Sequence, residues 1–201
     1  MSHFVVIVFG DDVDGQLEPY SEHIQVEPYF REDGDWVLEW GRKKLVEKGV
    51  LDPTLEQIAE AISDEEERYE ARDGKLGHMS TYNPKSKWDW YCVGGRWAGY
   101  FPMKPGCRGE VGDPCVFSIE PPRQGYADIA KLKDIDLERT MDGTLVPFAF
   151  VLNGEWFERG KMGWWACVTG EQDQAQWGAL FHKTLREQDP ETLLTAVDCH
   201  I

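Results

Sequence analysis

The sequence lacks several features that would place it outside ordinary globular proteins. Its five cysteines are an odd number and no two are spaced as C-x-x-C, which argues against a zinc knuckle or a dithiol redox motif and favours a reducing compartment. No run approaches the roughly 20 apolar residues of a membrane-spanning helix. The apolar stretch at residues 3–9 has neither the basic region nor the cleavage site of a signal peptide. With no internal repeats and no low-complexity linker, we expect one domain over residues 1–201, located in the cytoplasm and not in a membrane.

Positive charge is scarce as well. The chain has 21 Lys and Arg against 37 Asp and Glu, a formal net charge of −16. Such a chain repels polyanions, so extended nucleic acid is not an expected partner. The charge is typical of a solvated surface, and the alternative is an acidic protein that mimics nucleic acid or inhibits a host protein through its negative face. What the chain has in unusual number is tryptophan, with nine residues.

The clearest strands lie at the two ends of the chain. Residues 3–9 form a β-branched apolar run, and residues 192–201 form another. Between them, residues 148–157 predict a β-hairpin, because Asn153-Gly154 suits the two positive-φ positions of a type I′ turn. Terminal strands with helices and a hairpin between them predict an α+β fold, in which helices pack on a single mixed, mainly antiparallel sheet.

Helical spacing of apolar residues and helix-terminal signals predict the remaining elements. In the first helix, Trp36, Trp40 and Lys44 are expected on one face. Residues 13–35 are expected to be an irregular connection, residues 75–122 short strands and loops, and residues 163–168 a strand. The expected helices run from Trp36 to Lys48, from Asp52 to Asp73, from Tyr126 to Met141, and from a capping box at residues 169–172 to Asp189.

Basic and aromatic residues are interleaved between Asn83 and Trp97, in an otherwise negative chain. Tryptophan and tyrosine rings can stack on a base, Lys and Arg side chains can neutralise a phosphate, and paired glycines allow a close backbone approach. The segment predicts a binding site for a small anionic, nucleotide-like ligand. The alternative is that its aromatic residues belong to the core, with Arg96 stacked on a Trp ring and paired with an acidic residue. The candidate ligand-binding residues are Lys85, Lys87, Trp88, Trp90, Tyr91, Gly94, Gly95, Arg96 and Trp97. If the segment is a strand, Trp88 and Trp90 share one face and Asp89 and Tyr91 the other.

Candidate catalytic residues lie near the C-terminus. In a terminal strand, Asp198 and His200 would point the same way and Cys199 the opposite way. If this strand pairs with residues 3–9, they could join His3 and Asp11 or Asp12 in an acid–base or metal cluster. The alternative is a histidine that is only hydrogen-bonded. A metal site usually needs three protein ligands and only two positions here are convincing, so we expect no metal and no cofactor. His78 is a further catalytic candidate. Cys92 or Cys199 is a weak candidate for a nucleophile.

Several motifs together resemble a known family. They are Met1-Ser2-His3-Phe4, the block N-P-K-S-K-W-D-W-Y-x-x-G-G-R-W at 83–97, Gly125-Tyr126-Ala127-Asp128, the stretch at 158–165 and the close L-L-T-A-V-D-C-H-I at 193–201. This pattern is similar to a family of uncharacterised proteins carried by bacteriophages and by bacterial genomes with prophage content. The resemblance spans nearly the whole chain and implies no catalytic role. The phage context suggests, by analogy, proteins that capture a nucleotide immune signal of the host.

The leading hypothesis is therefore a phage-associated binding protein that captures a small anionic nucleotide-derived ligand and sequesters it, as an anti-defence sponge. The first alternative is a hydrolase or transferase acting on a similar ligand through Asp198, His200 or His78. The second is an acidic inhibitor of a host protein. A homo-oligomer is compatible with each of them.

Overall fold

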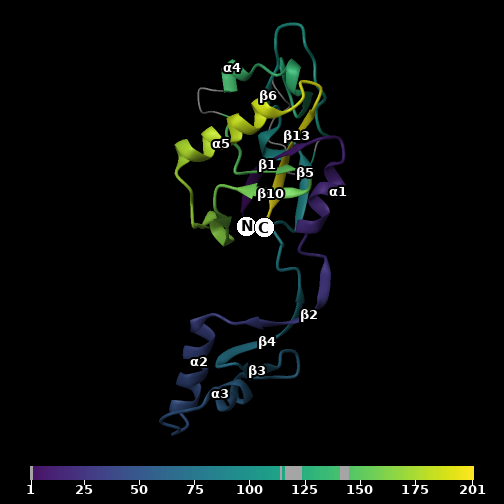
Figure 1. The fold of residues 1–201 in the computed structure, drawn as a ribbon. Coiled ribbons are helices and arrows are strands. Elements are labelled where there is room, and N and C mark those ends of the chain that lie inside the picture. The colour runs from purple at the N-terminus through teal and green to yellow at the C-terminus, as the bar shows by residue number, and fades with distance from the viewer. Residues whose placement is uncertain (1, 114, 116–123, 141–144) are drawn as a thin grey trace. The chain divides into compact units, whose positions relative to one another are not determined.

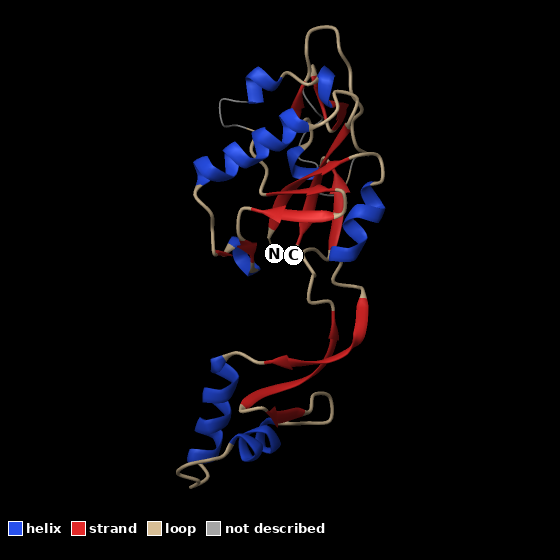
Figure 2. Cartoon of the chain, viewed as in Figure 1, coloured by secondary structure: helices blue, strands red, loops and turns tan. Residues whose placement is uncertain are grey.

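The computed structural model describes residues 2–113, 115, 124–140 and 145–201, and its fold is α+β, as the sequence predicted (Figures 1 and 2). Met1 of the N-terminal motif and Met141 at the end of an expected helix lie outside the described residues. By its internal contacts the chain divides into two compact units. Unit 1 comprises Met1–Ile24 and Pro84–Ile201, and unit 2 comprises Gln25–Asn83. This division reflects where contacts are dense and does not show whether either unit folds alone. The single domain over residues 1–201 therefore stays a prediction.

Unit 1 is built on a six-stranded sheet with the order β10-β9-β1-β13-β5, to which β8 adds by pairing with β13. Strands β1 and β9 run parallel, whereas the other neighbours run antiparallel. The sheet is thus mixed and mostly antiparallel, which confirms the predicted class. Its strands are β1 (His3–Phe9), β5 (Trp90–Val93), β8 (Ile129–Lys131), β9 (Ala149–Leu152), β10 (Glu155–Glu158) and β13 (Leu193–His200).

The two faces of this sheet carry separate apolar clusters, because side chains alternate along a strand. Val5, Ile7 and Phe9 of β1 pack with residues of α5 (Gln174–Glu187) on one face. Phe4, Val6 and Val8 pack with Leu17 of α1 (Val13–Leu17) on the other. Figure 1 shows the two helices on opposite sides of the sheet. The central strands β1 and β13 are therefore buried on both sides.

The predicted hairpin is present and has the predicted turn. Asn153 has φ 53° and Gly154 has φ 77°, which are the two positive values of a type I′ turn. Strand β9 precedes the turn and β10 follows it. The side chain of Gln16 accepts from the Gly154 N–H, and the Tyr20 hydroxyl donates to the Gly154 carbonyl.

Several local predictions for unit 1 are wrong. Residues 126–140 are short strands and short helices, not one helix, because β8 pairs with β13. The expected strand at 163–168 contains a 3-10 turn in which Trp165 has φ 61°, and the Ala166 N–H donates to Ser2 Oγ (2.8 Å). Helix α5 is capped by Asp173, not by Thr169. The smaller elements are η1 (Glu18–Tyr20), η2 (Gly95–Trp97), β6 (Phe101–Pro102), β7 (Tyr126–Ala127), η3 (Leu132–Asp134), α4 (Leu137–Thr140), β11 (Lys161–Met162), η4 (Trp164–Ala166) and β12 (Val168–Thr169).

Unit 2 is a three-stranded antiparallel sheet with two helices. The strand order is β2-β4-β3, formed by β2 (Gln25–Glu32), β4 (Lys75–Tyr82) and β3 (Tyr69–Arg72). The irregular connection expected at 13–35 is thus wrong, since it contains helix α1 and strand β2. Gln25 pairs with Tyr82, so the first and last strands of the unit meet where the chain enters and leaves it.

Helix α3 (Leu55–Ile62) begins and ends at other residues than expected. A capping box of Thr54 and Gln57 starts it, not Asp52, and Ser63 adopts an extended conformation after Ile62. The Ser63 hydroxyl then accepts from the Tyr69 N–H (2.9 Å). The acidic run at 64–67 is therefore not helical, and the chain turns into strand β3.

Helix α2 (Asp35–Val46) is present, and its two tryptophans lie on the side of the helix that faces solvent. Val37 and Gly41 are buried on its packed side, whereas Trp36 and Trp40 are exposed. A Cβ at Gly41 would lie only 2.6 Å from Cγ2 of Ile58 in α3. The two helices approach each other through this glycine, which turns the tryptophans outward.

No helix within the described part of the chain is long and apolar enough to cross a membrane.

Candidate functional site

Strand pairing in unit 1 brings four candidate polar residues together at one end of the sheet. His3 of β1 is paired with His200 of β13, and His200 is paired in turn with Trp90 of β5. The expectation that the terminal strands pair is confirmed, and Asp198 and His200 share a face while Cys199 is buried in the opposite cluster. Asp11 follows the other end of β1, beyond Phe9, so its expected place beside His200 is wrong.

Two histidine–aspartate pairs form at this end. Nδ1 of His3 donates to Oδ1 of Asp198 (2.9 Å), and Nδ1 of His200 donates to Oδ1 of Asp89 (2.7 Å). The His3 and Asp198 side chains are 3% and 0% exposed, and those of His200 and Asp89 are 7% and 26% exposed. We call these four residues the His–Asp cluster. A carboxylate on Nδ1 orients an imidazole and leaves Nε2 for other contacts, which is the arrangement of acid–base pairs in enzymes.

The Trp90 ring adjoins both imidazoles. It stacks on His200 with ring centroids 5.1 Å apart and an interplanar angle of 17°, and it meets His3 edge-on at 5.4 Å. The two imidazoles are themselves 4.9 Å apart. The backbone N–H of Trp90 donates to Asp89 Oδ1 (2.8 Å). The half-buried indole is therefore held in place by the His–Asp cluster.

The Gly94–Gly95 turn is shaped by two buried carboxylates. Gly94 and Gly95 have φ values of 74° and 54°, which favour glycine. A Cβ at Gly94 would lie 2.5 Å from Oδ2 of Asp128, and one at Gly95 would lie 2.5 Å from Oδ2 of Asp198. The glycines were expected to let a ligand approach the backbone. In the structure, the side chain of Asp128 lies against Gly94 and that of Asp198 against Gly95.

Asp198 connects this turn to the His–Asp cluster. Its Oδ1 accepts from His3, and its Oδ2 accepts from the backbone N–H of Arg96 (2.9 Å). Arg96 is thereby held beside the cluster by its main chain, while its side chain is exposed. Both carboxylate oxygens of Asp198 have a donor, as a buried charge requires.

Asp128 was not among the candidate site residues. It is 1% exposed, and its carboxylate accepts from the N–H groups of Gly99 (2.5 Å) and Gly112 (3.0 Å). It also holds β13 through a bond from the Ala196 N–H to its carbonyl (2.8 Å). Nothing in the neighbouring sequence distinguishes Asp128 from a surface aspartate. Only its place in the Gly125–Asp128 motif could have indicated a structural role.

The other aromatics of the central segment lie elsewhere. Trp88 precedes β5, donates from Nε1 to the Leu17 carbonyl (3.1 Å) and packs with Tyr91 on the α1 face. Trp97 packs against the α5-side cluster. The expectation that Trp88 and Trp90 share a face is therefore wrong, because the strand begins only at Trp90.

The basic residues of the segment differ in their surroundings. Lys87 forms an ion pair with Glu158 (2.7 Å) at a partly buried position. Lys85 and Arg96 are exposed. The three expected cationic groups thus differ in exposure, with Lys87 about a quarter exposed and the other two more open to solvent.

The cysteines near the cluster are poor nucleophiles. Burial, with a hydrogen bond to Cys115, raises the pKa of the Cys92 thiol to about 12. Burial also raises the pKa of Cys199 well above its ordinary value. Because the thiolate is the reactive form, neither residue fits a catalytic nucleophile at neutral pH.

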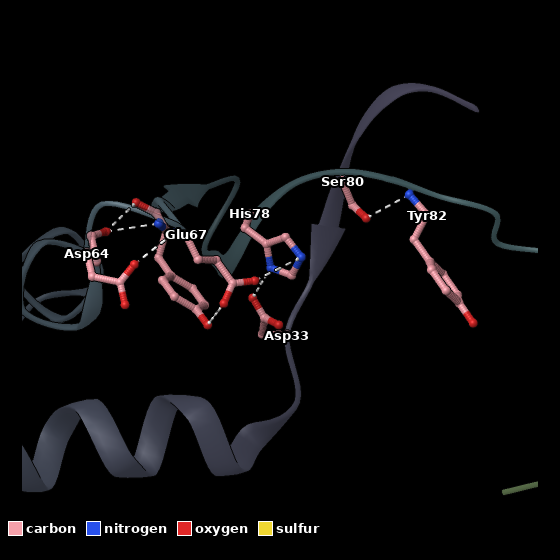
Figure 3. A network of polar contacts seen from close by, with 8 residues as sticks. Asp33, Asp64, Glu67, His78, Ser80 and Tyr82 are labelled. Atoms are coloured by element: carbon pink, nitrogen blue, oxygen red, sulfur yellow. Dashed lines mark hydrogen bonds and ion pairs between the residues drawn. The ribbon is translucent and has the colours of Figure 1, made fainter. Parts of the chain in front are cut away.

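His78 lies in a separate network in unit 2 (Figure 3). Its Nδ1 donates to Asp33 Oδ2 (2.9 Å) and its Nε2 lies 3.5 Å from Glu67 Oε1. The Tyr69 hydroxyl donates to the same carboxylate (2.7 Å), and Asp64 accepts from the Glu67 N–H. Both imidazole nitrogens thus face carboxylates of the unit itself, and the contacts join the start of α2 to the 64–67 loop.

Within the described residues, no group of three or more His, Cys, Asp or Glu side chains is arranged to hold a metal ion. No protein-family model, no curated protein and no solved structure matches the chain.

Proposed function

We propose that the protein binds a small anionic, nucleotide-like ligand at the surface where Trp90 and Arg96 flank the His–Asp cluster. The observation that carries this proposal is the Asp198 carboxylate, which joins the Arg96 backbone to His3 and so to the Trp90 ring. An indole ring suits a base and a guanidinium suits a phosphate, and both residues are tied to the same cluster, Trp90 through its ring and Arg96 through its backbone. In the phage setting that the motifs suggest, the protein would sequester a signal nucleotide in the host cytoplasm.

The charges around this surface are compatible with an anion. Asp198 and Asp89 are both engaged by donors, including an imidazole each, so their charge is partly compensated. Lys85 and Arg96 supply exposed positive charge in the same segment. Trp88 and Lys87, which are occupied within unit 1, would support the site and not contact the ligand.

Isothermal titration calorimetry with a panel of linear and cyclic nucleotides tests the proposal. Arg96→Ala keeps the backbone N–H that Asp198 requires, so it removes the guanidinium without removing the cluster. We expect at least about a tenfold loss of affinity, or 1.4 kcal/mol. Arg108→Ala, at an exposed arginine of the same unit, is the matched control and should bind as the parent protein does. Binding weaker than about 1 mM across the panel, or an unchanged affinity of Arg96→Ala, contradicts the proposal.

A second candidate, a hydrolase or transferase on the same ligand, is favoured by the 2.7 Å contact of His200 with Asp89. A carboxylate that orients an imidazole prepares it for proton transfer. Mass spectrometry of the ligand after incubation distinguishes the two functions. If the ligand is recovered intact after heat denaturation, the protein binds without turnover; if product forms and His200→Gln abolishes it while binding persists, the enzyme is supported.

A further inference from the structure

Two neighbouring tryptophans of α2 in unit 2 face solvent. Trp36 is 71% exposed and Trp40 is 48% exposed. They are four residues apart and so adjoin on the helix surface. A neighbouring side of α2, about 100° round the helix, packs on α3 through Val37 and Gly41. We call the outward side, with Trp36 and Trp40, the Trp36–Trp40 face.

Neither tryptophan belongs to the apolar cluster of Gln25–Asn83, which is formed by Val37, Ile58, Ala59, Ile62 and Leu76. The Lys44 side chain lies over one of the two rings: its Nζ is 5.2 Å from the Trp40 ring centroid and donates to the Ala61 carbonyl (2.6 Å). A cation over an indole is worth about 0.5–1 kcal/mol at an exposed site, much less than burying the ring. Two adjacent exposed indoles are therefore the signature of an interaction surface.

The charges beside the tryptophans change sign along the helix. Asp35 and Glu39 lie in the N-terminal half, and Arg42 and Lys43 lie in the C-terminal half; all four are exposed. Spacings of three and four residues place them in one row next to the tryptophans. The helix dipole favours this order, but it does not account for the exposed rings. In an antiparallel pair of such helices, the same row of each helix faces that of the other, so acidic halves meet basic halves.

We propose that the Trp36–Trp40 face is a self-association surface, on which α2 of a second copy of this chain packs antiparallel about a two-fold axis near Trp40. Trp40 meets Trp40 of the partner at the axis, and Trp36 lies opposite the basic C-terminal half of the partner helix. Such a contact is isologous, because each copy contributes the same residues. Twelve residues span only about 18 Å, so the interface is small and the dimer reversible.

Sedimentation velocity of the full chain from about 5 to 500 µM tests the surface. We expect the sedimentation coefficient to rise with concentration. Trp36→Ala with Trp40→Ala should weaken self-association at least about tenfold. Trp165→Ala, which removes an 80% exposed tryptophan of unit 1, is the control and should associate like the parent. A parent protein that stays monomeric throughout, or an unaffected double variant, overturns the proposal; a monomer would instead direct the search to a different partner protein.

Charge reversal tests the antiparallel arrangement separately. One variant carries Arg42→Glu and Lys43→Glu, and another carries Asp35→Lys and Glu39→Lys. Each row then has a single sign, so each variant alone should stay monomeric, whereas an equimolar mixture should form the heterodimer. Circular dichroism confirms that both variants fold. Failure of the mixture to associate overturns the arrangement, as does association of either variant alone.

Discussion

The two tryptophan-bearing segments of the molecule differ in which way their rings face. In the central segment, Trp88, Trp90 and Trp97 are half-buried and each contacts the sheet or its apolar clusters. In α2, Trp36 and Trp40 face solvent. The sequence suggested a ligand surface for the first segment and, for the second, only that Trp36 and Trp40 share one face of a helix. The difference teaches that an aromatic pattern predicts a structural element more securely than it predicts the side the element presents.

The largest effect should follow from removing the carboxylate under the central segment. Asp198→Ala leaves the Arg96 N–H and the His3 imidazole buried without their acceptor. We expect a loss of about 4 kcal/mol in the free energy of unfolding, measured by urea denaturation. Asp11→Ala, at an exposed aspartate of the same unit, should change it by less than about 0.5 kcal/mol. Equal effects of the two would show that Asp198 does not hold the segment.

A second test asks whether the Gly94–Gly95 turn is held by contact or by conformation alone. Gly94 and Gly154 have φ values of 74° and 77°, but only Gly94 has a carboxylate within 4 Å of an added Cβ. Gly154→Ala should cost about 1 kcal/mol through its backbone, and Gly94→Ala about 3 kcal/mol, because the Asp128 clash adds to that strain. Thermal unfolding measures both variants. Equal costs would contradict the role given to Asp128.

Replacing one tryptophan from each segment tests whether the two segments differ in burial. Trp90→Ala removes a ring stacked on His200, and we expect it to destabilise unit 1 by about 2 kcal/mol. Trp36→Ala, at a 71% exposed ring, should change stability by less than about 0.5 kcal/mol at low protein concentration. Chemical denaturation followed by circular dichroism measures both. A larger effect for Trp36 would reverse the assignment of the two segments.

The last prediction concerns the reactivity of cysteines and involves no change in stability. With its pKa at about 12 in place of an ordinary 9.0, Cys92 should hold roughly a thousandfold less thiolate near neutral pH. Iodoacetamide at pH 8 should therefore alkylate the exposed Cys167 long before Cys92, as followed by peptide mass spectrometry. Rapid labelling of Cys92 in the native protein would show that the central segment opens readily.

Elements with a strong local signal were predicted well from the sequence. The Asn153–Gly154 turn needs only its own two residues to adopt positive φ, and the 3–9 strand needs only its continuous run of β-branched and other apolar residues. Residues 126–140 carry apolar residues at helical spacing, yet they form short strands and short helices in place of one helix, because β8 pairs with β13. Their conformation depends on residues some 65 positions away, which no local pattern reports.

The candidate site was predictable in part for the same reason. Asp198, His200 and His3 follow from alternation and from the pairing of two recognisable strands. The Asp89 partner, the stacked Trp90 and the buried Asp128 depend on where β5 and the Gly125–Asp128 stretch meet β13. That register is set by tertiary packing, so the sequence could name these positions as a motif but not assign their contacts.

Composition and local patterns were sufficient for the α+β class, the terminal strands and the hairpin. Tertiary structure decided which way the tryptophans face and which residues meet. In α2 the decision lies with Gly41, whose missing side chain lets Ile58 approach and so sets the rotation of the helix. In the central segment it lies with the pairing of His200 and Trp90. Both are contacts between residues distant in the chain, whose energies appear only when the folded chain brings them together.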